Sequence, residues 1–302
     1  MENNKKKVIA LGFFDGIHLG HQALLRRAVD RAREHNMTPA VFTFDRSPRE
    51  VVSGVPIPLL STAEERRQLI ADRFPISEVI IAPFDREMMT MPWEDFVPML
   101  AEKYHAGWLI VGHDFRFGYQ GSGTPDRLAR AAEVLGIGCD VIPAVTLDGV
   151  TVSSTHIRSL LLRGDMVEAA RFLGHPFTIV GTVLHGKGLG TKLAAPTLNV
   201  IPPPGRLIPA HGVYITRVTV DGKRYNAVTN VGVRPTVDVN GGLTVESHLL
   251  HQSVQLYDQS CRVDFLKMIR PEMQFGSLTE LQVQISADKS AANAYFSRSY
   301  TE

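Results

Sequence analysis

The sequence predicts a two-domain protein, with an α/β domain built on a parallel sheet followed by an antiparallel β domain that ends in a helix. In the first half, strand-like apolar runs alternate with helical patterns, which is typical of a parallel sheet with helices on both faces. After Gly174 the pattern changes to short β-branched and aromatic runs separated by turn residues. The length of 302 residues also fits about two domains. We therefore expect domains over residues 1–175 and 176–302.

The first half alternates between short strands and longer helices. The expected strands are the apolar runs Val8–Leu11, Ala40–Phe44, Val79–Ala82, Trp108–Val111 and Cys139–Val145. The expected helices are His21–Glu34, Ser61–Arg73, Pro92–His105 and Pro125–Leu135. Ser61 and Thr62, followed by two glutamates, mark a helix start, and Gly136 marks a helix end. Ligands of such sheets bind beyond the carboxyl ends of the strands, so the loops there are the place to look for a site.

The second half predicts hairpins. Two strand-like runs, Val213–Val220 and Lys223–Val228, flank the dipeptide Asp221-Gly222, which is a strong signal for a tight hairpin turn. Several short strands with turns between them indicate an antiparallel barrel or sandwich. A helix over about Ser277–Phe296 is expected to close the chain.

Composition excludes several classes of protein. The net charge of +1 provides no global basic field for nucleic acid. Cys139 and Cys261 form no CxxC pair and are expected to be reduced thiols in a cytoplasmic protein. The apolar run after the N-terminal lysines is short and is broken by Gly12 and Asp15, so no signal peptide is expected. We also expect no membrane span.

The most informative segment is GFFDGIHLGH, residues 12–21, between the first strand and the first helix. A glycine-rich turn lets backbone N–H groups approach a phosphate, and a helix N-terminus favours its negative charge. His18 and His21 at that helix start suit nucleotidyl transfer, in which charge builds on the α-phosphate under attack. A metal site and a purely structural pair are the alternatives, and the surrounding glycines favour phosphate handling. Gly12, Phe13 and Asp15 complete the expected ATP contacts.

A second segment, SSTHIR at residues 153–158, follows a strand and a turn and precedes an apolar helical run. Ser154 and Thr155 offer hydroxyls and free N–H groups at a helix start. Arg158 lies one turn further along, where its guanidinium suits a bidentate phosphate contact. An ordinary capped helix is the alternative for this segment alone. Together with the HxGH segment, it resembles the nucleotidyltransferase superfamily whose signatures are HxGH and ISSTxxR.

Two more loops follow strands of the predicted sheet. Thr43-Phe44-Asp45 ends one strand, and VGHDFRFG at residues 111–118 ends another. Aromatic and charged side chains at such a strand end suit a planar ligand, so Asp45, Asp114 and Phe115 are candidate binding residues. A turn packed by two phenylalanines is the alternative for residues 111–118.

The second half carries its own candidate chemistry. Gly186, Gly188 and Gly190 form a glycine-rich loop that can fold over phosphates, with a plain loop as the alternative. Thr197 and Asn199 then offer a hydroxyl and an amide oxygen, which are hard ligands suited to Mg²⁺ with ATP. Glu246 lies in a run of alternating polarity, where facing solvent is the default for an isolated glutamate.

With both halves in view, the chain resembles the prokaryotic bifunctional riboflavin kinase/FAD synthetase family from about Val8 to Phe296. The matching segments, in order, are GFFDGIHLGH, TFD, LLSTAEER, VGHDFRFG, SSTHIR, PTLN, VGVRPT, VESHLL and FLKMIRPEMQF. The resemblance implies an N-terminal Rossmann-like module that adenylylates FMN with ATP. It also implies a C-terminal six-stranded barrel that phosphorylates riboflavin.

The resemblance also implies residue roles. His18 and His21 would stabilise the adenylyl-transfer transition state. The ATP phosphates would be held by Ser154, Thr155 and Arg158. Flavin contacts would come from Asp45, Asp114, Phe115 and Arg234. In the kinase, Thr197 and Asn199 would bind Mg-ATP and Glu246 would be the general base for the ribityl 5′-hydroxyl. ATP, riboflavin and FMN are then the expected partners, with Mg²⁺ accompanying ATP.

Some positions depart from the usual family pattern. The departures are Arg46, Ser47, His156, Thr191, Ala194, Ala195, His251 and Gln252. On a helix that begins near Ser154, His156 points about 200° away from Arg158, so we expect His156 to be peripheral to catalysis. The alternatives are a monofunctional enzyme with one degenerate module and a non-catalytic flavin- or RNA-binding regulator on the same scaffold.

Overall fold

The computed structural model describes residues 5–184, 197–233, 243–250 and 259–298. The chain forms two compact units, which divide between Ser154 and Thr155. Within these described ranges, no helix combines the length and the apolar character needed to cross a bilayer. Both units have the predicted architecture, and each is described separately below.

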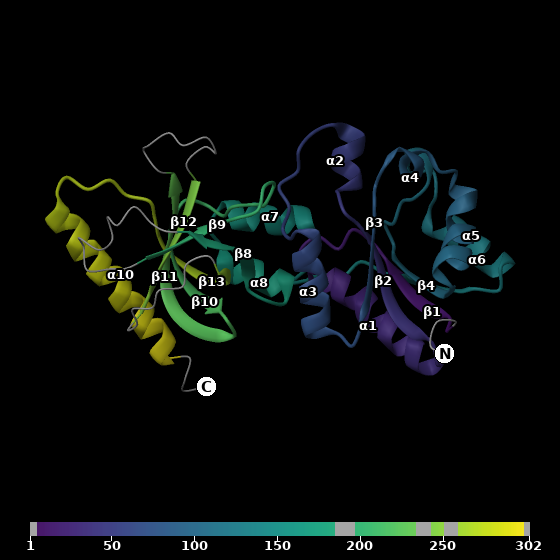
Figure 1. Ribbon diagram of the computed structural model, residues 1–302, viewed down its shortest axis with the longest axis horizontal. Coiled ribbons are helices and arrows are strands. Elements are labelled where there is room, and N and C mark those ends of the chain that lie inside the picture. Colours follow the sequence, from purple (N-terminus) through teal and green to yellow (C-terminus); the bar gives the residue numbers. More distant parts are fainter. Residues whose placement is uncertain (1–4, 185–196, 234–242, 251–258, 299–302) are drawn as a thin grey trace. The chain divides into compact units, whose positions relative to one another are not determined.

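A parallel five-stranded sheet forms the centre of the first unit (Figure 1). Its strands are β1 (Lys7–Leu11), β2 (Thr38–Phe44), β3 (Glu78–Ala82), β4 (Ala106–Gly112) and β5 (Gly138–Ile142). They lie in the order β3-β2-β1-β4-β5. The chain therefore moves outward from β1 in both directions, which makes the carboxyl ends of β1 and β4 the topological switch point where ligands of such sheets bind.

Helices cover both faces of this sheet, as the sequence predicts. The longer ones are α1 (Leu19–Glu34), α3 (Ala63–Arg73), α5 (Trp93–Tyr104) and α6 (Pro125–Val134). Short helices are α2 (Pro48–Ser53), α4 (Arg86–Thr90) and the 3₁₀ turn η1 (Tyr119–Gly121). Alternate residues of β1 face opposite ways, so Val8 and Ala10 pack with α1 and α3, whereas Ile9 and Leu11 pack with α5 and α6. The buried strand β1 thus carries the loop that follows it on a rigid support.

Element ends differ slightly from the sequence-based expectations. The strand expected over Cys139–Val145 ends at Ile142, because Pro143 has no N–H for the ladder. The helix expected from Ser61 begins at Ala63, because Thr62 caps it and forms a capping box with Glu65. Two short strands, β6 (Thr146–Leu147) and β7 (Val150–Thr151), form a hairpin around Asp148-Gly149.

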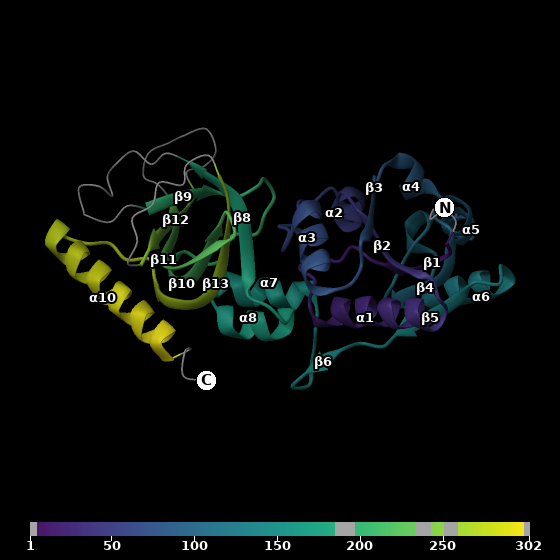
Figure 2. The ribbon, with the colours of Figure 1, turned by 60° about the horizontal axis from the view of Figure 1, so that its bottom comes forward.

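The second unit contains a closed six-stranded antiparallel barrel (Figure 2). Its strands are β8 (Phe177–Leu184), β9 (Thr197–Ile201), β10 (Gly212–Val220), β11 (Lys223–Val233), β12 (Leu243–Leu249) and β13 (Ser260–Pro271). The order around the barrel is β10-β11-β12-β9-β8-β13. The predicted hairpin is present, with Val220 paired to Lys223 across the Asp221-Gly222 turn.

The barrel interior is filled by apolar side chains and by one row of hydroxyl groups. Thr216, Thr229 and Ser247 are fully buried on three adjacent strands. Their hydroxyl oxygens lie 2.6 and 2.8 Å apart along the row, so each polar group is hydrogen-bonded inside the barrel. Because side chains alternate along a strand, the neighbouring residues of β11 and β12 face outward.

Helix α10 (Leu278–Arg298) packs on that outer face, and both views of the unit show it running beside the barrel (Figures 1 and 2). Ala292 and Phe296 of α10 form a cluster with Ile215 and Leu250 of the barrel. Polar residues of β9, β11 and β12 share the outer face with this cluster.

The division of the structure lies earlier in the chain than the predicted domain boundary at 175/176. The difference consists of α7 (Ser154–Leu162) and α8 (Met166–Leu173). Helix α8 contacts β8 and β13, and its Phe172 and Leu173 are buried. Helix α8 groups with the barrel because it buries apolar side chains against it, and α7 contacts α8 through His156 and Phe172.

Candidate active sites

The first candidate site is the start of α1. His18 is the N-cap, and its Nδ1 accepts a hydrogen bond of 3.2 Å from the backbone N–H of His21. The two imidazole rings are stacked, with centroids 3.6 Å apart and an angle of 14° between the planes. A Cβ on Gly20 would lie 3.1 Å from Cε1 of His18, so glycine there leaves room for the ring. The HxGH spacing thus builds an imidazole pair at the helix N-terminus.

The cap determines where His18 carries its proton. Nδ1 accepts a hydrogen bond, so the neutral ring holds its proton on Nε2. Protonation of Nδ1 would break the cap and place positive charge at the positive end of the helix dipole. With Nδ1 used by the cap, Nε2 is the nitrogen of His18 that can donate to an incoming group.

The surroundings of His21 keep its imidazole neutral. Burial lowers the pKa of His21 well below its usual value, and the nearby His18 and Arg66 lower it further. Its Nδ1 is buried and has no hydrogen-bond partner among the described residues. The ring of Phe14 packs edge-on against it at 5.2 Å between centroids. An orphaned nitrogen beside a helix N-terminus is free to bond an incoming group.

Asp15 ties the loop to two other segments. Its Oδ1 accepts a bond of 2.9 Å from the backbone N–H of Ser61, and the Ser61 hydroxyl accepts one of 2.8 Å from the N–H of Gly16. The hydroxyl of Ser154 donates to the Asp15 carbonyl at 3.1 Å. The first residue of α7 therefore lies at the loop that follows β1. Ser61, expected only as a helix start, is here an anchor of the site.

Arg66 of α3 lies beneath this loop and is completely buried. Its guanidinium lies 4.3 Å from the ring centroid of Phe13. Burial lowers the pKa of Arg66 to about 10, against the opposing effects of Asp15, Glu65 and Asp45, so it remains a cation at neutral pH. The sequence analysis did not single out this residue.

The predicted flavin residues of the first unit lie on two strand-end loops. Asp45 follows β2, and its Oδ1 accepts bonds from the backbone N–H groups of Arg46 and Phe84. Asp114 follows β4, and its side chain is 83% exposed. Phe115 packs against Phe117 and the apolar cluster below it. Both loops leave the sheet at its carboxyl edge, as expected.

Residues 155–158 of the SSTHIR segment lie in the second unit. Thr155 is exposed and Arg158 is half-buried on α7. The His156 ring packs edge-on against Phe172 of α8, with centroids 4.6 Å apart. The roles of Thr155 and Arg158 toward the histidine pair stay predictions.

The second candidate site is a polar row on the outer face of the barrel. Glu246 of β12 lies opposite Asn199 of β9 on one side and opposite Asn230 of β11 on the other. His248, two residues along the same strand, lies opposite Thr197. The register thus gathers the predicted Thr197, Asn199 and Glu246, and adds Asn230 and His248, which sequence reasoning missed.

A cavity of about 420 Å³ lies between this row and α10. Its polar wall includes Thr197, Asn230, Glu246 and His248. Its apolar wall is formed by Val213, Val228, Met273, Phe275, Leu281 and Ile285. A partly apolar cavity with few polar groups is the usual form of a small-molecule site. Glu246 is half-buried in the cavity wall and does not simply face solvent.

Arg270 and Asp288 also line this cavity and form an ion pair with each other. Arg270 of β13 donates from its guanidinium to both carboxylate oxygens of Asp288 on α10, at 2.9–3.2 Å. Gln284 donates a further bond of 2.9 Å to the same carboxylate. Asp288 is only 4% exposed. This pair holds α10 in place beside the polar row.

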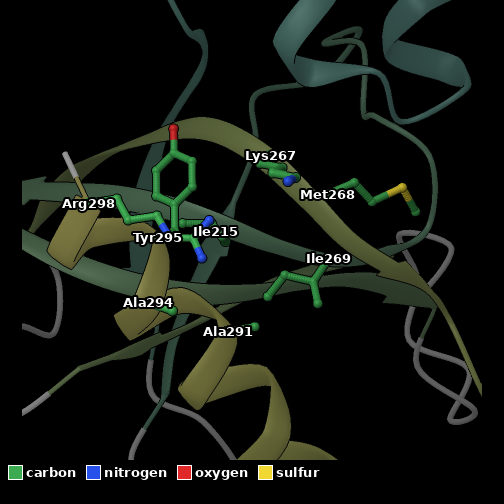
Figure 3. Close-up of a pocket in the computed structure, with 8 residues that line it drawn as sticks. All are labelled: Ile215, Lys267, Met268, Ile269, Ala291, Ala294, Tyr295 and Arg298. Atoms are coloured by element: carbon green, nitrogen blue, oxygen red, sulfur yellow. The ribbon is translucent and has the colours of Figure 1, made fainter.

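Four predicted site residues, Gly186, Gly188, Gly190 and Arg234, lie outside the described residues, as do the departures Thr191, Ala194, Ala195, His251 and Gln252. A second cavity of the barrel unit, about 450 Å³, is lined by the C-terminal half of α10 and by β10 and β13. Figure 3 shows the Tyr295 ring standing beside Ile215 there. The predicted site residues that the structure describes do not line this cavity.

A sequence signal for Arg66 exists in retrospect. It precedes Leu69 and Ile70 by three and four residues, which places it on the buried face of α3. An arginine on the apolar face of a helix is expected to be buried and to be hydrogen-bonded there. Asn230 and His248 carry no such local signal, because only strand register brings them to Glu246.

Comparisons with known proteins agree with this two-site arrangement. A family model described as FAD synthetase matches residues 1–156, and one described as riboflavin kinase matches residues 173–296. A bifunctional riboflavin kinase/FMN adenylyltransferase from Pseudomonas fluorescens is 38% identical over 95% of this chain and 92% of its own length. A protein of the same description from Escherichia coli K12 is 34% identical over 96% of this chain and 92% of its own length.

The fold also matches a solved structure over almost the whole chain. A crystal structure described as a macrolide-efflux protein from Streptococcus pneumoniae has a TM-score of 0.86 and is 27% identical. The match covers 97% of this chain and 95% of that one.

Proposed function

The chain belongs to the family of bifunctional riboflavin kinases/FMN adenylyltransferases, and we propose that each of its two domains performs one of the two reactions. The enzyme phosphorylates riboflavin to FMN and adenylylates FMN to FAD. We assign the adenylyltransferase to residues 1–175 and the kinase to residues 176–302, with the reduced thiols Cys139 and Cys261 fitting a cytoplasmic enzyme.

In adenylyl transfer, a phosphate oxygen of FMN attacks the α-phosphorus of ATP and pyrophosphate leaves. We assign the Nε2–H of His18 and the imidazole of His21 to the phosphoryl oxygens on which charge builds. Ser154, Thr155 and Arg158 hold the ATP phosphates, while Asp45, Asp114 and Phe115 bind the flavin. The support is the stacked imidazole pair at a helix N-terminus, at the switch point of the sheet.

In riboflavin phosphorylation, the ribityl 5′-hydroxyl attacks the γ-phosphorus of ATP, and ADP leaves. We assign Glu246 as the base that accepts the hydroxyl proton. The flavin occupies the cavity of about 420 Å³ beside α10, whose apolar wall suits the ring system. The position of Glu246 in this wall, between Asn199 and Asn230, is the observation that carries the kinase assignment.

We propose that Mg²⁺ enters the kinase site with ATP. Thr197 and Asn199 are oxygen donors on one face of β9, and hydroxyl and amide oxygens are suitable ligands for this hard ion. The ion would neutralise negative charge on the phosphate groups during transfer. The residues of the chain then orient ATP and remove the proton from the acceptor hydroxyl.

The decisive experiment separates the two reactions in one protein. Wild type, His18→Ala and Glu246→Gln are each incubated with riboflavin or FMN and Mg-ATP, and the flavins are separated by chromatography. We expect His18→Ala to lose FAD formation and keep FMN formation. Glu246→Gln should lower FMN formation by roughly 10²–10⁴-fold and keep FAD formation from added FMN. Each variant is the control for the other.

The outcomes distinguish the alternatives. A wild-type protein that makes FMN alone or FAD alone is monofunctional. One that binds flavin and makes neither product is a regulator on this scaffold. Near-normal kinase activity in folded Glu246→Gln would show that this carboxylate is not the general base.

A further inference from the structure

The most unusual group of the first unit is the buried cation of Arg66. Its side chain has no exposed surface, although arginine is seldom fully buried without a carboxylate partner. Its hydrogen bonds go to two backbone carbonyls, 2.6 Å to Phe44 and 3.3 Å to Ser61. Its Nε has no hydrogen-bond partner among the described residues. Burial of this charge is costly, and the carbonyl bonds and the charges of Asp15, Glu65 and Asp45 offset the cost only in part, since the pKa of Arg66 stays lowered.

Arg66 connects three segments that the proposed adenylyl-transfer site needs. Through the face of Phe13 it contacts the loop between β1 and the histidine pair. Through the Phe44 carbonyl it holds the end of β2, next to Asp45. Through the Ser61 carbonyl it holds the start of α3, whose Ser61 in turn bonds Asp15 and Gly16. The loop after β1, which carries residues proposed to bind ATP, and the end of β2, next to the proposed flavin residue Asp45, thus both contact the Arg66 guanidinium.

Arg66 interacts electrostatically with three carboxylates and with the imidazole of His21. Asp15, Glu65 and Asp45 are the acidic groups whose charges act on Arg66, from the loop after β1, from α3 and from the end of β2. His21 of α1 is influenced by His18 on its own element and by Arg66 from α3, and both lower its pKa after burial. A buried cation close to an orphaned imidazole nitrogen creates a positive region at the α1 N-terminus, where the proposed substrate is an anion.

We propose that Arg66 is a positioning residue for FMN adenylylation, which aligns the His18–His21 loop with the flavin-side strand end and adds positive potential for the triphosphate. This inference rests on the proposed role of the histidine pair. Because Arg66 is buried, it acts through Phe13, Phe44 and Ser61 and through its field, and it does not bond the substrate itself.

The chain supplies a matched control for this inference. Arg67, the next residue of α3, is 52% exposed in its side chain and pairs with Glu64 on the surface. Arg66→Met keeps the length of the side chain and removes the charge and donors. Arg66→Lys keeps the charge and loses the forked geometry that reaches two carbonyls. Arg67→Met removes the same charge from the same helix on its exposed side.

The experiment assays all three full-length variants for both reactions, and follows the titration of His21 by NMR of ¹³C-labelled histidine. Trp93 and Trp108, the only tryptophans of the chain, lie in the first unit, so their fluorescence verifies that this unit is folded. We expect Arg66→Met to lower kcat/KM of FMN adenylylation by about 10–100-fold, mainly in kcat. His21 should titrate at higher pH in this variant than in wild type.

Arg66→Lys should restore the wild-type titration of His21 and recover only part of the adenylylation rate. Arg67→Met should match wild type in both readouts, and riboflavin phosphorylation should stay within about twofold in every variant. A merely structural role would lower the stability of the first unit and leave kcat of adenylylation in the folded protein unchanged.

Adenylylation within twofold of wild type in folded Arg66→Met, with an unchanged His21 titration, would overturn the proposal. If Arg66→Met does not fold, Arg66→Lys decides the question, and wild-type adenylylation in that folded variant overturns it. His18→Ala keeps the two proposals apart. If His18→Ala retains adenylylation, the function assigned to the histidine pair fails whatever the Arg66 variants do.

Discussion

At the scale of single residues, the proposed adenylyltransferase site depends on two stacked imidazoles. His18 caps α1 through Nδ1, and His21 is kept neutral by burial and by the nearby His18 and Arg66. The His21 imidazole therefore adds no charge to a site proposed to bind a highly charged nucleotide. The positive potential of the site comes from the helix N-terminus and from Arg66.

The depressed pKa of His21 predicts that the first unit loses stability in mild acid. The folded state resists protonation of His21, whereas the unfolded chain binds a proton near pH 6.5. The stabilising effect is complete above about pH 6.5 and is lost as pH falls from there toward the folded pKa. Each unit of depression corresponds to about 1.4 kcal/mol. Urea unfolding followed by tryptophan fluorescence at pH 5.5 and 7.5 measures this effect.

His21→Gln should reduce this pH dependence, because glutamine does not titrate. His113→Gln is the control, since that side chain is 50% exposed. Equal pH dependence in wild type and His21→Gln would show that the acid sensitivity of the unit has another origin.

Arg158→Ala should abolish most FAD formation and spare FMN formation. Removal of a charged hydrogen-bond donor to a phosphate costs about 1.5–3 kcal/mol, or about 10–150-fold in kcat/KM. The control is Arg163→Ala, an exposed arginine just beyond α7. Equal loss of both activities in folded Arg158→Ala would contradict separate sites.

His156→Arg should change FAD synthesis only slightly, because the His156 ring packs against Phe172. The measurement is the ATP KM of adenylylation between pH 6 and 8. If His156 bound phosphate, replacing its imidazole by a permanently charged guanidinium would lower the KM and remove its change with pH. Such a result would show that His156 contacts ATP.

At the scale of elements, the proposed kinase site is formed by the packing of one helix against one face of the barrel. Ala292 and Phe296 anchor the later part of α10 in an apolar cluster, and the Arg270–Asp288 pair anchors its middle. The earlier part, with Leu281 and Ile285, forms a wall of the cavity proposed to hold the flavin. The cavity therefore keeps its shape only while α10 stays docked.

Asp288→Asn should loosen this docking, because it leaves the Arg270 guanidinium without its charged partner. We expect a loss of about 1–3 kcal/mol in unfolding free energy of the second unit and a higher KM for riboflavin. FMN adenylylation should be unchanged. Asp221→Asn at the exposed hairpin turn is the control. An unchanged riboflavin KM in folded Asp288→Asn would show that the pair does not shape the cavity.

At the scale of the whole molecule, α7 and α8 follow directly on the first unit in the chain, and α7 carries residues assigned to adenylylation. They follow the last hairpin of the first unit, and α8 buries apolar residues against the barrel of the second. The SSTHIR segment crosses the point where the structure divides. Arg158 belongs to the unit that contains the barrel, although it is assigned to FMN adenylylation. The folding of that unit is therefore expected to affect adenylylation.

Fragments test this division. Residues 176–302 should phosphorylate riboflavin without the rest of the chain. Residues 155–302 should do so too and should be more stable, because Phe172 and Leu173 then stay buried against β8 and β13. Thermal unfolding by circular dichroism and a kinase assay measure both expectations. If folded fragment 176–302 neither binds flavin nor makes FMN, the kinase assignment to these residues is wrong.

Sequence alone determined the class of each half, the order of the main elements and the loops that carry the chemistry. These features depend on patterns within a few residues, such as the alternation of apolar runs, the Asp221-Gly222 turn and the HxGH spacing at a helix start. The position of the histidines could be predicted because a strand, a glycine-rich turn and a helix follow one another directly.

Only the tertiary structure decided which distant residues meet. The barrel closes as β10-β11-β12-β9-β8-β13, and this register places Asn230 and His248 beside Glu246 and Thr197. The burial of Arg66 against Phe44 depends in the same way on packing between separate elements. The physical reason is that strand register and helix docking are set by the fit of whole surfaces, which a local pattern does not contain.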